Sequence, residues 1–454
     1  MRKENPTAAP LSFKEPICVL VDPLQRFLLV ESADGLVLLA AAAAALILAN
    51  SPLSAAFLGF WQQPFGFEFG GIGMRMPIQL WINDGLMAIF FFVIGLEVKR
   101  EILLGELREI RKAALPIAAA LGGMIVPAAI YLSMQAGAPG ERGWGIPMAT
   151  DIAFVVGCMA LLGPRLPNGL RVMLLTLAIA DDIGAILVIA IGYSDALNYH
   201  ALGMSLVGVA VFVTLLKLGV RNNLVYLLMG TWIWFEFHES GIHATVSGVI
   251  IGLMTPLRSW VSPGRFNFVV QKTLKDLQAC DEKGTAVRYA LIRQMQLSAR
   301  DALSPLERLE TELHPWVGFV IMPLFALANA GVALDFKVLS DPVSIAVLLG
   351  LFLGKPVGIF LFSWVAVKLK LARLPDGVTW PVLAAGGILG GIGFTMALFI
   401  AGLALGGELL DAAKVGVMAG SAISAVFGMG LIVLLRRKAP SADSCPPPEG
   451  LDAD

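Results

Sequence analysis

Two adjacent aspartates, Asp181 and Asp182, lie inside the apolar stretch LAIADDIGAILVIA (177–190). They are about ten residues from either end of a predicted membrane span, which at 1.5 Å per residue places them roughly 15 Å deep, near the bilayer midplane. Ionisable side chains at this depth are costly, and they usually face a bundle interior or a water-filled cavity. A single aspartate could stay protonated and bond a neighbouring helix, whereas two in succession favour a site for cations or protons.

Two further ionisable residues occur deep in predicted spans. Asp151 lies in GIPMATDIAF (145–154), where Pro147 and flanking glycines interrupt the helix. Irregular backbone at that depth is tolerated only when it is buried in protein or lines a cavity. An aspartate there can cap a new helix start or serve a cation site, and both roles stay open. Lys355, in LLGLFLGKPVGIFLFSW, requires a nearby acid or carbonyls unless its ammonium reaches the membrane interface.

The composition is typical of a polytopic membrane protein. Hydrophobic residues make up 57% of the chain and charged residues 15%, whereas soluble domains carry about a quarter charged residues. A helix needs about 20 largely apolar residues to cross the hydrocarbon core. The sequence therefore predicts an all-α membrane protein of about twelve spans, near 34–51, 78–98, 113–134, 145–162, 170–192, 200–218, 223–238, 241–257, 315–333, 343–368, 380–405 and 413–435.

A second interrupted helix is predicted in the eleventh span. The stretch AAGGILGGIGFTM (384–396) is rich in glycine, and each glycine weakens a helix by roughly 1 kcal/mol relative to alanine. Close packing through small residues is the alternative explanation. Interruptions in the fourth and eleventh spans nevertheless fall in corresponding halves of the chain. They predict inverted-topology repeats, with spans three to five matching spans ten to twelve around a midplane site.

The distribution of lysine and arginine predicts the orientation. Basic residues gather in alternate connections, such as 99–112, 217–221 and 368–373, whereas 192–199 and 235–240 contain none. The positive-inside rule then places both termini in the cytoplasm.

Four segments complete the domain organisation. A polar cytoplasmic tail, 1–22, lacks the apolar core of a cleaved signal, and the membrane domain spans 23–437. Within it, 258–312 is a mixed-charge insert that we predict to be cytoplasmic and partly helical. The Pro-rich, acidic tail 438–454 is predicted to be disordered. A net charge of −1 gives no basic excess for nucleic acid, the four cysteines lack metal or disulfide spacing, and we predict no cofactor.

A β-hairpin is predicted at 61–80. Phe65, Phe67 and Phe69 alternate before a Gly-Gly pair, and Ile72, Met74 and Met76 alternate after it. An isolated hairpin is marginally stable in water, so it should pack on something. A second subunit is one partner, and the lipid headgroups are the alternative.

Seven stretches resemble one known family. In chain order they are INDGLMAIFFFVIGLEVKRE (82–101), ATDIAF (149–154), LAIADDIGA (177–185), GIHATVSGVIIG (241–252), LHPWVGFVIMPLFALANAG (313–331), GKPVGI (354–359) and GGIGFTMALFI (390–400). Together, from about Pro23 to Arg437, they resemble the NhaA-type Na⁺/H⁺ antiporters of bacteria, the standard example of inverted-topology repeats. The segment 258–312 is longer than the short connection typical of that family.

The resemblance implies a function and a set of roles. It implies a pH-regulated, electrogenic secondary transporter of the bacterial inner membrane that exports Na⁺ or Li⁺ and admits protons. It also implies a homodimer that forms through the 61–80 hairpin. Asp181, Asp182, Asp151 and Thr150 match the ion site, with the transported Na⁺ at the adjacent pair, and Lys355 matches its charge partner. Asp84 matches a further intramembrane acid. The pH-response positions are matched by Glu97, Arg100, Glu101, His243, Glu310 and His314.

Two other classes of membrane protein fit the sequence less well. A proton-coupled solute symporter is the alternative function, but the midplane residues include few aromatic or arginine side chains to hold a larger substrate. An intramembrane aspartyl protease needs two aspartates that face each other and share a proton. Asp181 and Asp182 diverge by about 100° on one helix, so we predict that the chain is not an enzyme.

Overall fold

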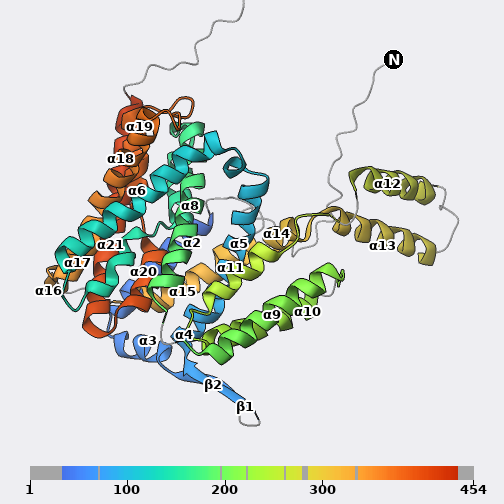
Figure 1. Ribbon diagram of the computed structural model, residues 1–454, viewed down its shortest axis with the longest axis horizontal. Coiled ribbons are helices and arrows are strands. Elements are labelled where there is room, and N and C mark those ends of the chain that lie inside the picture. Colours follow the sequence, from blue (N-terminus) through green and yellow to red (C-terminus); the bar gives the residue numbers. More distant parts are fainter. Residues whose placement is uncertain are drawn as a thin grey trace, which may run out of the picture.

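The computed structural model describes residues 33–69, 72–194, 197–220, 223–259, 262–278, 285–332 and 336–437. The predicted tails 1–22 and 438–454 and the Gly-Gly turn of the hairpin lie outside the described residues. The described chain forms a bundle of packed helices, from which a helical hairpin projects on one side and a β-hairpin at one end (Figure 1).

Helices occur at all twelve predicted spans. Eight are long and apolar enough to cross a membrane, and ten if each bent pair counts as one span, within the described residues. The two others, α10 (Asn223–Glu239) and α11 (Thr245–Met254), are shorter. The uninterrupted spans are α6 (Ile110–Gln135), α8 (Asn168–Gly192), α9 (Tyr199–Lys217) and α21 (Gly407–Arg437).

Other spans combine helical segments of different pitch. Helices α2 (Ala33–Ala49) and α3 (Ser54–Trp61) form the first bent pair. Three short helices are η2 (Glu106–Arg108), η4 (Gly163–Arg165) and α16 (Phe336–Leu339). The composite spans are α4 (Ile78–Leu80), η1 (Trp81–Leu86) and α5 (Met87–Leu103); α14 (Pro305–Trp316), η5 (Val317–Ile321) and α15 (Met322–Asn329); and α17 (Pro342–Leu349), η6 (Gly350–Gly354) and α18 (Lys355–Lys368).

Small residues bring the central helices into close contact. A Cβ atom added to Gly122 of α6 would lie 2.1 Å from the carbonyl oxygen of Gly358 in α18. Similarly, one added to Gly252 of α11 would lie 2.5 Å from the carbonyl oxygen of Phe92 in α5. Glycine therefore allows backbone-to-backbone packing that any side chain would prevent, as is common between membrane helices. The α6–α18 contact brings Lys355 toward the middle of the bundle.

Both predicted helix interruptions are confirmed, and the two interrupted spans contact each other. In the fourth span, η3 (Glu141–Met148) ends before α7 (Ile152–Leu162) begins, and in the eleventh span α19 (Trp380–Gly390) meets α20 (Phe394–Ala404) at a bend of 47°. The backbone N–H of Asp151 donates to the carbonyl oxygen of Ile392 at 2.7 Å. Around this crossing, α6 packs on α8 and α17 packs on α21, the outer helices of the two predicted repeats.

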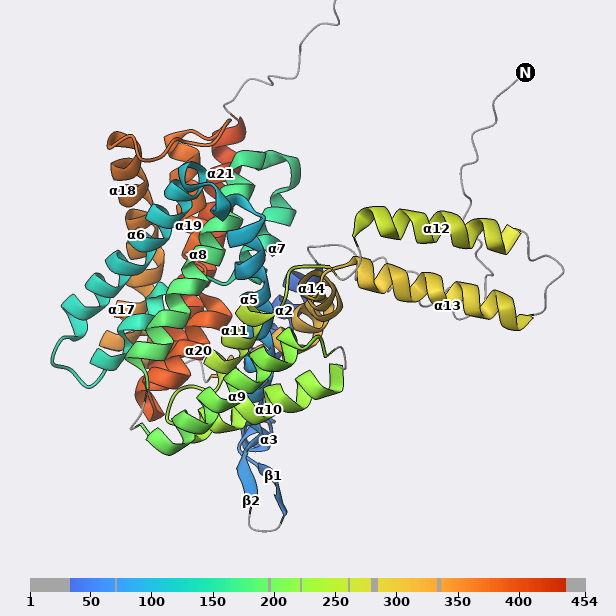
Figure 2. The ribbon, with the colours of Figure 1, turned by 45° about the vertical axis from the view of Figure 1, so that its right-hand side comes forward.

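The predicted hairpin is confirmed, with its strands inside the predicted segment 61–80. Strands β1 (Pro64–Phe69) and β2 (Ile72–Pro77) are antiparallel, with Phe65 opposite Met76 and Phe67 opposite Met74. Figure 2 shows the two strands extending beyond the helices at the end of the molecule near α3.

The insert is helical, as predicted, but its end differs from the prediction. It contains α12 (Pro263–Gln278) and α13 (Thr285–Ala302), after which α14 begins at Pro305 rather than near residue 315. Ser304 and Glu307 form a capping box, in which Ser304 Oγ accepts from the Glu307 N–H at 3.1 Å and Glu307 accepts from the Ser304 N–H. This reciprocal cap starts the helix early. Glu310 and His314 therefore lie within the helix of the ninth span and not before it.

Candidate functional site

The centre of the bundle contains a buried ion pair. Lys355 Nζ lies 2.7 Å from Asp181 Oδ2, and both side chains are fully enclosed, with relative exposures of 0% and 1%. Lys355 Nζ also donates to the carbonyl oxygen of Met148, and Thr150 Oγ1 donates to Asp181 Oδ2 at 2.6 Å. Three elements thus meet here: α8 provides the acid, α18 the cation, and the interrupted fourth span the hydroxyl and the carbonyl.

Local backbone irregularity positions Lys355. The lysine directly follows the π-helical segment η6 and precedes Pro356, which has no N–H to donate. Single π-helical turns inside longer helices are frequent at functional sites. At Gly354 the backbone of α18 approaches Pro127 of α6 so closely that a Cβ atom would lie 2.9 Å from the proline Cα. The close approach and the changed pitch together turn the lysine toward Met148 and Asp181.

Asp182 differs from its neighbour. It is buried to the same degree, but its Oδ2 atom has no hydrogen-bond partner among the described residues, and neither has Asp181 Oδ1. Buried oxygens of this kind are expensive unless something satisfies them, and each exception in a folded protein requires an explanation. Two such oxygens occur on adjacent residues, and buried carboxylate oxygens of this kind suit a proton or a hard cation with oxygen ligands.

Asp151 lies at the crossing of the two interrupted helices. Its Oδ1 accepts from the Phe154 N–H at 3.0 Å, which caps α7, and its Oδ2 accepts from the Thr395 N–H at 3.0 Å and from the Thr395 hydroxyl. One carboxylate therefore satisfies the start of α7 and the start of α20 together. Negative charge is favourable at helix N-termini, so Asp151 joins the two broken spans electrostatically as well as by hydrogen bonds.

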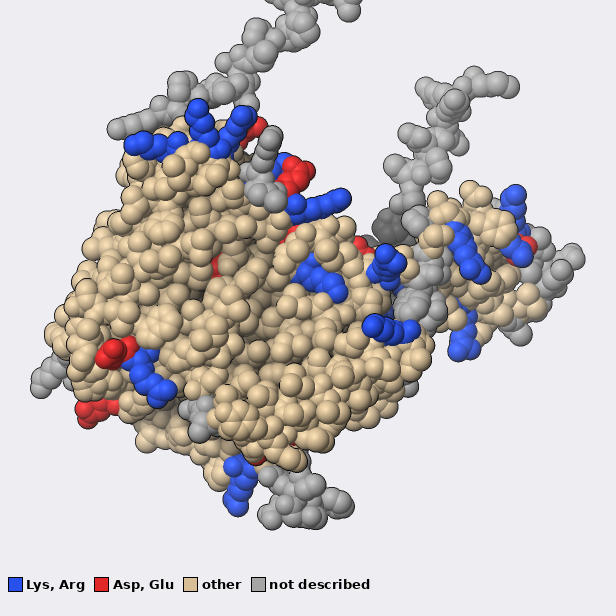
Figure 3. Space-filling model, in the orientation of Figure 1, with Lys and Arg blue, Asp and Glu red and all other residues tan. Residues whose placement is uncertain are grey.

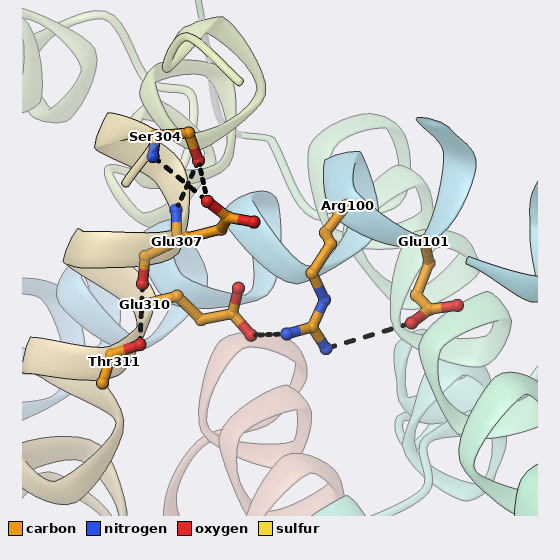
Figure 4. Close-up of polar contacts among 6 residues, drawn as sticks. All are labelled: Arg100, Glu101, Ser304, Glu307, Glu310 and Thr311. Atoms are coloured by element: carbon orange, nitrogen blue, oxygen red, sulfur yellow. Dashed lines mark hydrogen bonds and ion pairs between the residues drawn. The ribbon is translucent and has the colours of Figure 1, made fainter. Parts of the chain in front are cut away.

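A second cluster of charges lies where the end of α5 meets the start of α14. Arg100 Nη1 forms an ion pair with Glu310 Oε1, and Arg100 Nη2 lies 3.9 Å from Glu101 Oε1. Figure 4 shows Arg100 between the two glutamates, with the Ser304–Glu307 capping box above Glu310 on the same helix. The structure thus brings together three of the predicted pH-response residues from segments about 200 positions apart in sequence. Hydrophobic periodicity describes only local sequence, so it could not have predicted this contact.

Comparison with known proteins identifies the family. The family model for Na⁺/H⁺ antiporter 1 matches residues 25–433, which is most of the chain. The chain belongs to this family. A protein named Na⁺/H⁺ antiporter NhaA from Rhodopirellula baltica is 53% identical over 419 residues, covering 92% of this chain and 95% of that protein. One of the same name from Rhizobium meliloti is 50% identical over 422 residues, covering 93% and 97%.

A family member with lower sequence identity aligns over an equally large share of this chain. The Na⁺/H⁺ antiporter NhaA 2 of Vibrio vulnificus is 45% identical over 424 residues, covering 93% of this chain and 94% of that protein. These matches confirm the resemblance drawn from the seven motifs. They run through both interrupted spans, so the crossing lies within the part of the chain that aligns with these antiporters.

Three of the remaining predicted residues lie apart from the central ion pair, whereas Glu97 is close enough to Asp182 to interact with it electrostatically. Asp84 is in η1, where its Oδ2 is 3.8 Å from His238 Nδ1 and its carbonyl oxygen accepts from the indole N–H of Trp234. His243 Nε2 lies 2.8 Å from the carbonyl oxygen of Tyr193. Glu97 is partly buried one turn before Arg100 on α5, and His314 is exposed one turn after Glu310 on α14.

Sequence reasoning missed several groups in this antiporter fold. Thr395 holds Asp151 through both its N–H and its hydroxyl, and the carbonyl oxygens of Met148 and Ile392 accept hydrogen bonds at the crossing. His238, beside Asp84, was also missed. The motif GGIGFTM contains Thr395, and a polar residue directly after a glycine-rich break is a signal that could have identified it. The carbonyls carry no such signal, because they depend only on how the two segments cross.

Proposed function

We propose that this chain exchanges Na⁺ for H⁺ across the membrane, and that Asp181 and Asp182 bind the two ions in turn. The observation that carries the proposal is the pair of buried, unsatisfied carboxylate oxygens on these adjacent residues. Membership of a family whose members are named Na⁺/H⁺ antiporters supports the choice of ions. A larger solute finds little to bind here, so the symporter is not favoured.

Competition for the same oxygens provides the exchange chemistry. Na⁺ is a hard cation that takes oxygen ligands, as other hard cations do. A carboxylate that holds a proton cannot at the same time give that oxygen to a metal ion, so occupancy by one ion excludes the other. Exchange then requires only that the site opens to one side of the membrane at a time.

The surrounding residues have different roles in this proposal. Lys355 and Thr150 bond one oxygen of Asp181, which leaves Asp182 as the residue whose carboxylate is most open to an ion. Both oxygens of Asp151 accept hydrogen bonds within the protein, so we assign that residue to holding the crossing and assign ion coordination first to Asp182. Lys355 compensates the charge of Asp181 when the site carries no cation.

The direction and regulation of transport extend the same proposal. We assign the basic connections and both termini to the cytoplasm of a bacterial inner membrane, with Na⁺ or Li⁺ leaving and protons entering electrogenically. Arg100 of α5 forms an ion pair with Glu310 of α14, and Glu101 lies beside the arginine, which suits a pH-responsive contact. We extend that role to Glu97, His243 and His314.

We also propose homodimerisation through β1 and β2, because Phe65 is exposed on strands that project from the bundle.

Replacement of Asp182 tests the function directly. In proteoliposomes, Asp182→Asn should reduce Na⁺-driven proton movement to the level of protein-free vesicles. The reason is that a side-chain amide carries no charge and does not take up a proton near neutral pH. The matched control is Asp376→Asn, which makes the same change at an exposed position between α18 and α19 and should transport normally. Retained exchange in a folded Asp182→Asn protein would remove the central assignment.

A further inference from the structure

The helices α12 and α13 form a hairpin that stands apart from the bundle. They pack on each other, with Thr273 of α12 buried between them, and Figures 1 and 2 show the pair extending away from the other helices. Nothing in the exchange chemistry proposed above uses these residues. Two amphipathic helices in mutual contact can each bury only one side, so their outward sides must be suited either to water or to a partner.

The outward sides of the hairpin are not suited to water alone. Phe268 of α12 and Tyr289 of α13 are 65% and 67% exposed, although aromatic side chains are usually well buried. Further large apolar side chains are exposed beside them: Leu274, Val287, Ile292 and Leu297. Comparable exposure occurs on the helices long and apolar enough to span a membrane, for example at Val426 of α21, as expected of a position that faces lipid.

The same two helices carry an excess of positive charge. Each contains three lysines or arginines and one aspartate. The described basic side chains are all exposed, namely Arg265, Lys272, Lys275, Arg293 and Arg300. Figure 3 shows blue side chains on the projecting hairpin, whereas most of the surface of the bundle in that view is uncharged. In both helices an exposed apolar residue lies one turn from a basic one, as Phe268 does from Lys272 and Leu297 from Arg293.

The hairpin is attached at one end of the spans. Only Leu303 and Ser304 separate α13 from α14, which starts the Pro305–Asn329 span, and α11 of the bundle precedes α12. The start of α14 is also where Glu310 meets Arg100 at the end of α5. The tether therefore keeps the base of the hairpin close to the membrane surface on that side, within reach of lipid headgroups.

We propose that the α12–α13 hairpin docks on the anionic lipid surface at this end of the spans, with its exposed apolar side chains among the headgroups and its basic side chains on lipid phosphates. Helices with basic residues beside aromatic and aliphatic ones bind such interfaces, and each lysine or arginine contributes about a fivefold gain near an anionic surface. A second copy of the hairpin fits less well, because two surfaces of the same positive sign repel each other.

Spin labels on the full-length protein in nanodiscs test the docking. The label is attached to a cysteine at Phe268 in a background whose four native cysteines are serine. Collision with oxygen, which concentrates in lipid, is compared with collision with a water-soluble nickel complex. Labels at Val426, which is exposed on a span, and at Asp376, which is exposed in a connection, provide the lipid and water references.

In phosphatidylglycerol discs the label at Phe268 should resemble the Val426 reference, and in phosphatidylcholine discs or high salt it should shift toward the Asp376 reference. The triple change Lys272→Glu, Lys275→Glu and Arg293→Glu should lower the docked fraction at least tenfold, whereas Lys272→Arg, Lys275→Arg and Arg293→Lys should preserve it.

A label at Phe268 that behaves like the Asp376 reference in every lipid would overturn the proposal. So would shielding that appears only in discs holding two copies, because that result assigns the surface to a second protomer. Transport is not the readout, so the outcome is independent of the exchange site.

Discussion

Two oppositely charged pairs hold separate parts of this antiporter together, and they differ in their surroundings. Lys355 and Asp181 meet at the centre of the bundle with almost no exposed surface. Arg100 and Glu310 meet at the end of α5 and α14, where the arginine side chain is 41% exposed and the glutamate side chain 10%. The chemistry of the two pairs is similar, but the access of water to them is not.

This difference predicts how each pair responds to change. A buried charge whose partner is removed has no water to replace it, so the loss costs about 3–5 kcal/mol, whereas pairs with solvent access are typically worth 0–1 kcal/mol, by order of magnitude. The central pair is therefore suited to a site in which one cation must be replaced by another. The outer pair is suited to a contact that opens and closes at little cost.

The largest effect is expected at the central pair. Lys355→Ala should lower the free energy of unfolding by about 3–5 kcal/mol, because it leaves the Asp181 carboxylate buried without a cation. Thermal unfolding of the purified protein in detergent measures this loss. Adding Asp181→Asn should recover part of it, since the second change removes the stranded charge.

The double variant is the control for this interpretation. Residues in contact show a coupling energy that differs from zero, whereas independent residues do not. If Lys355→Ala with Asp181→Asn is no more stable than either single variant, the ion pair does not govern the stability of the site.

A smaller effect is expected where the interrupted helices cross. Asp151→Ala removes the acceptor for the Phe154 N–H and for both donors of Thr395, and should destabilise the protein by about 2–3 kcal/mol. Thr395→Val removes only the hydroxyl and should cost about 1 kcal/mol. Equal losses in the two variants would mean that Asp151 does not join α7 to α20. Thermal unfolding again provides the measurement, with Thr311→Val on the exposed side of α14 as the matched control.

The smallest effect on stability is expected at the outer pair. Glu310→Gln should change the free energy of unfolding by less than about 1 kcal/mol, because the Arg100 side chain that it leaves without this partner is 41% exposed, and high salt should remove the difference from the wild type. Under the proposed function, the pH dependence of transport should nevertheless move while the maximal rate stays the same. A pH profile identical to that of the wild type would exclude this pair from pH regulation.

Patterns local in sequence predicted much of this fold. Apolar length located the helices, alternating apolar residues on either side of a Gly-Gly pair located the β-hairpin, and proline and glycine marked both interruptions. The partnership of Lys355 with Asp181 followed from the family resemblance and from the need of a buried cation for an acid. The start of α14 at Pro305 was missed, although Ser304 and Glu307 have the spacing of a capping box.

Contacts made through the backbone could not be predicted. The carbonyl oxygens of Met148 and Ile392 depend on the angle and depth at which the two broken spans cross, and every residue has such an oxygen. For the same reason, the contrast between Asp181 and Asp182 is absent from their sequence context. It arises because the helix turns one carboxylate toward Lys355 and Thr150 and the other away from them.

The most direct test of the account is proton release on Na⁺ binding. Titration calorimetry of the purified protein in two buffers with different heats of ionisation measures how many protons leave when Na⁺ binds. The account predicts that the heat of Na⁺ binding differs between the buffers for the wild type and for Asp376→Asn, and that Asp182→Asn gives no such difference. Na⁺ binding to the wild type with the same heat in both buffers, at every pH tested, would contradict the claim that Na⁺ and protons occupy the same carboxylates.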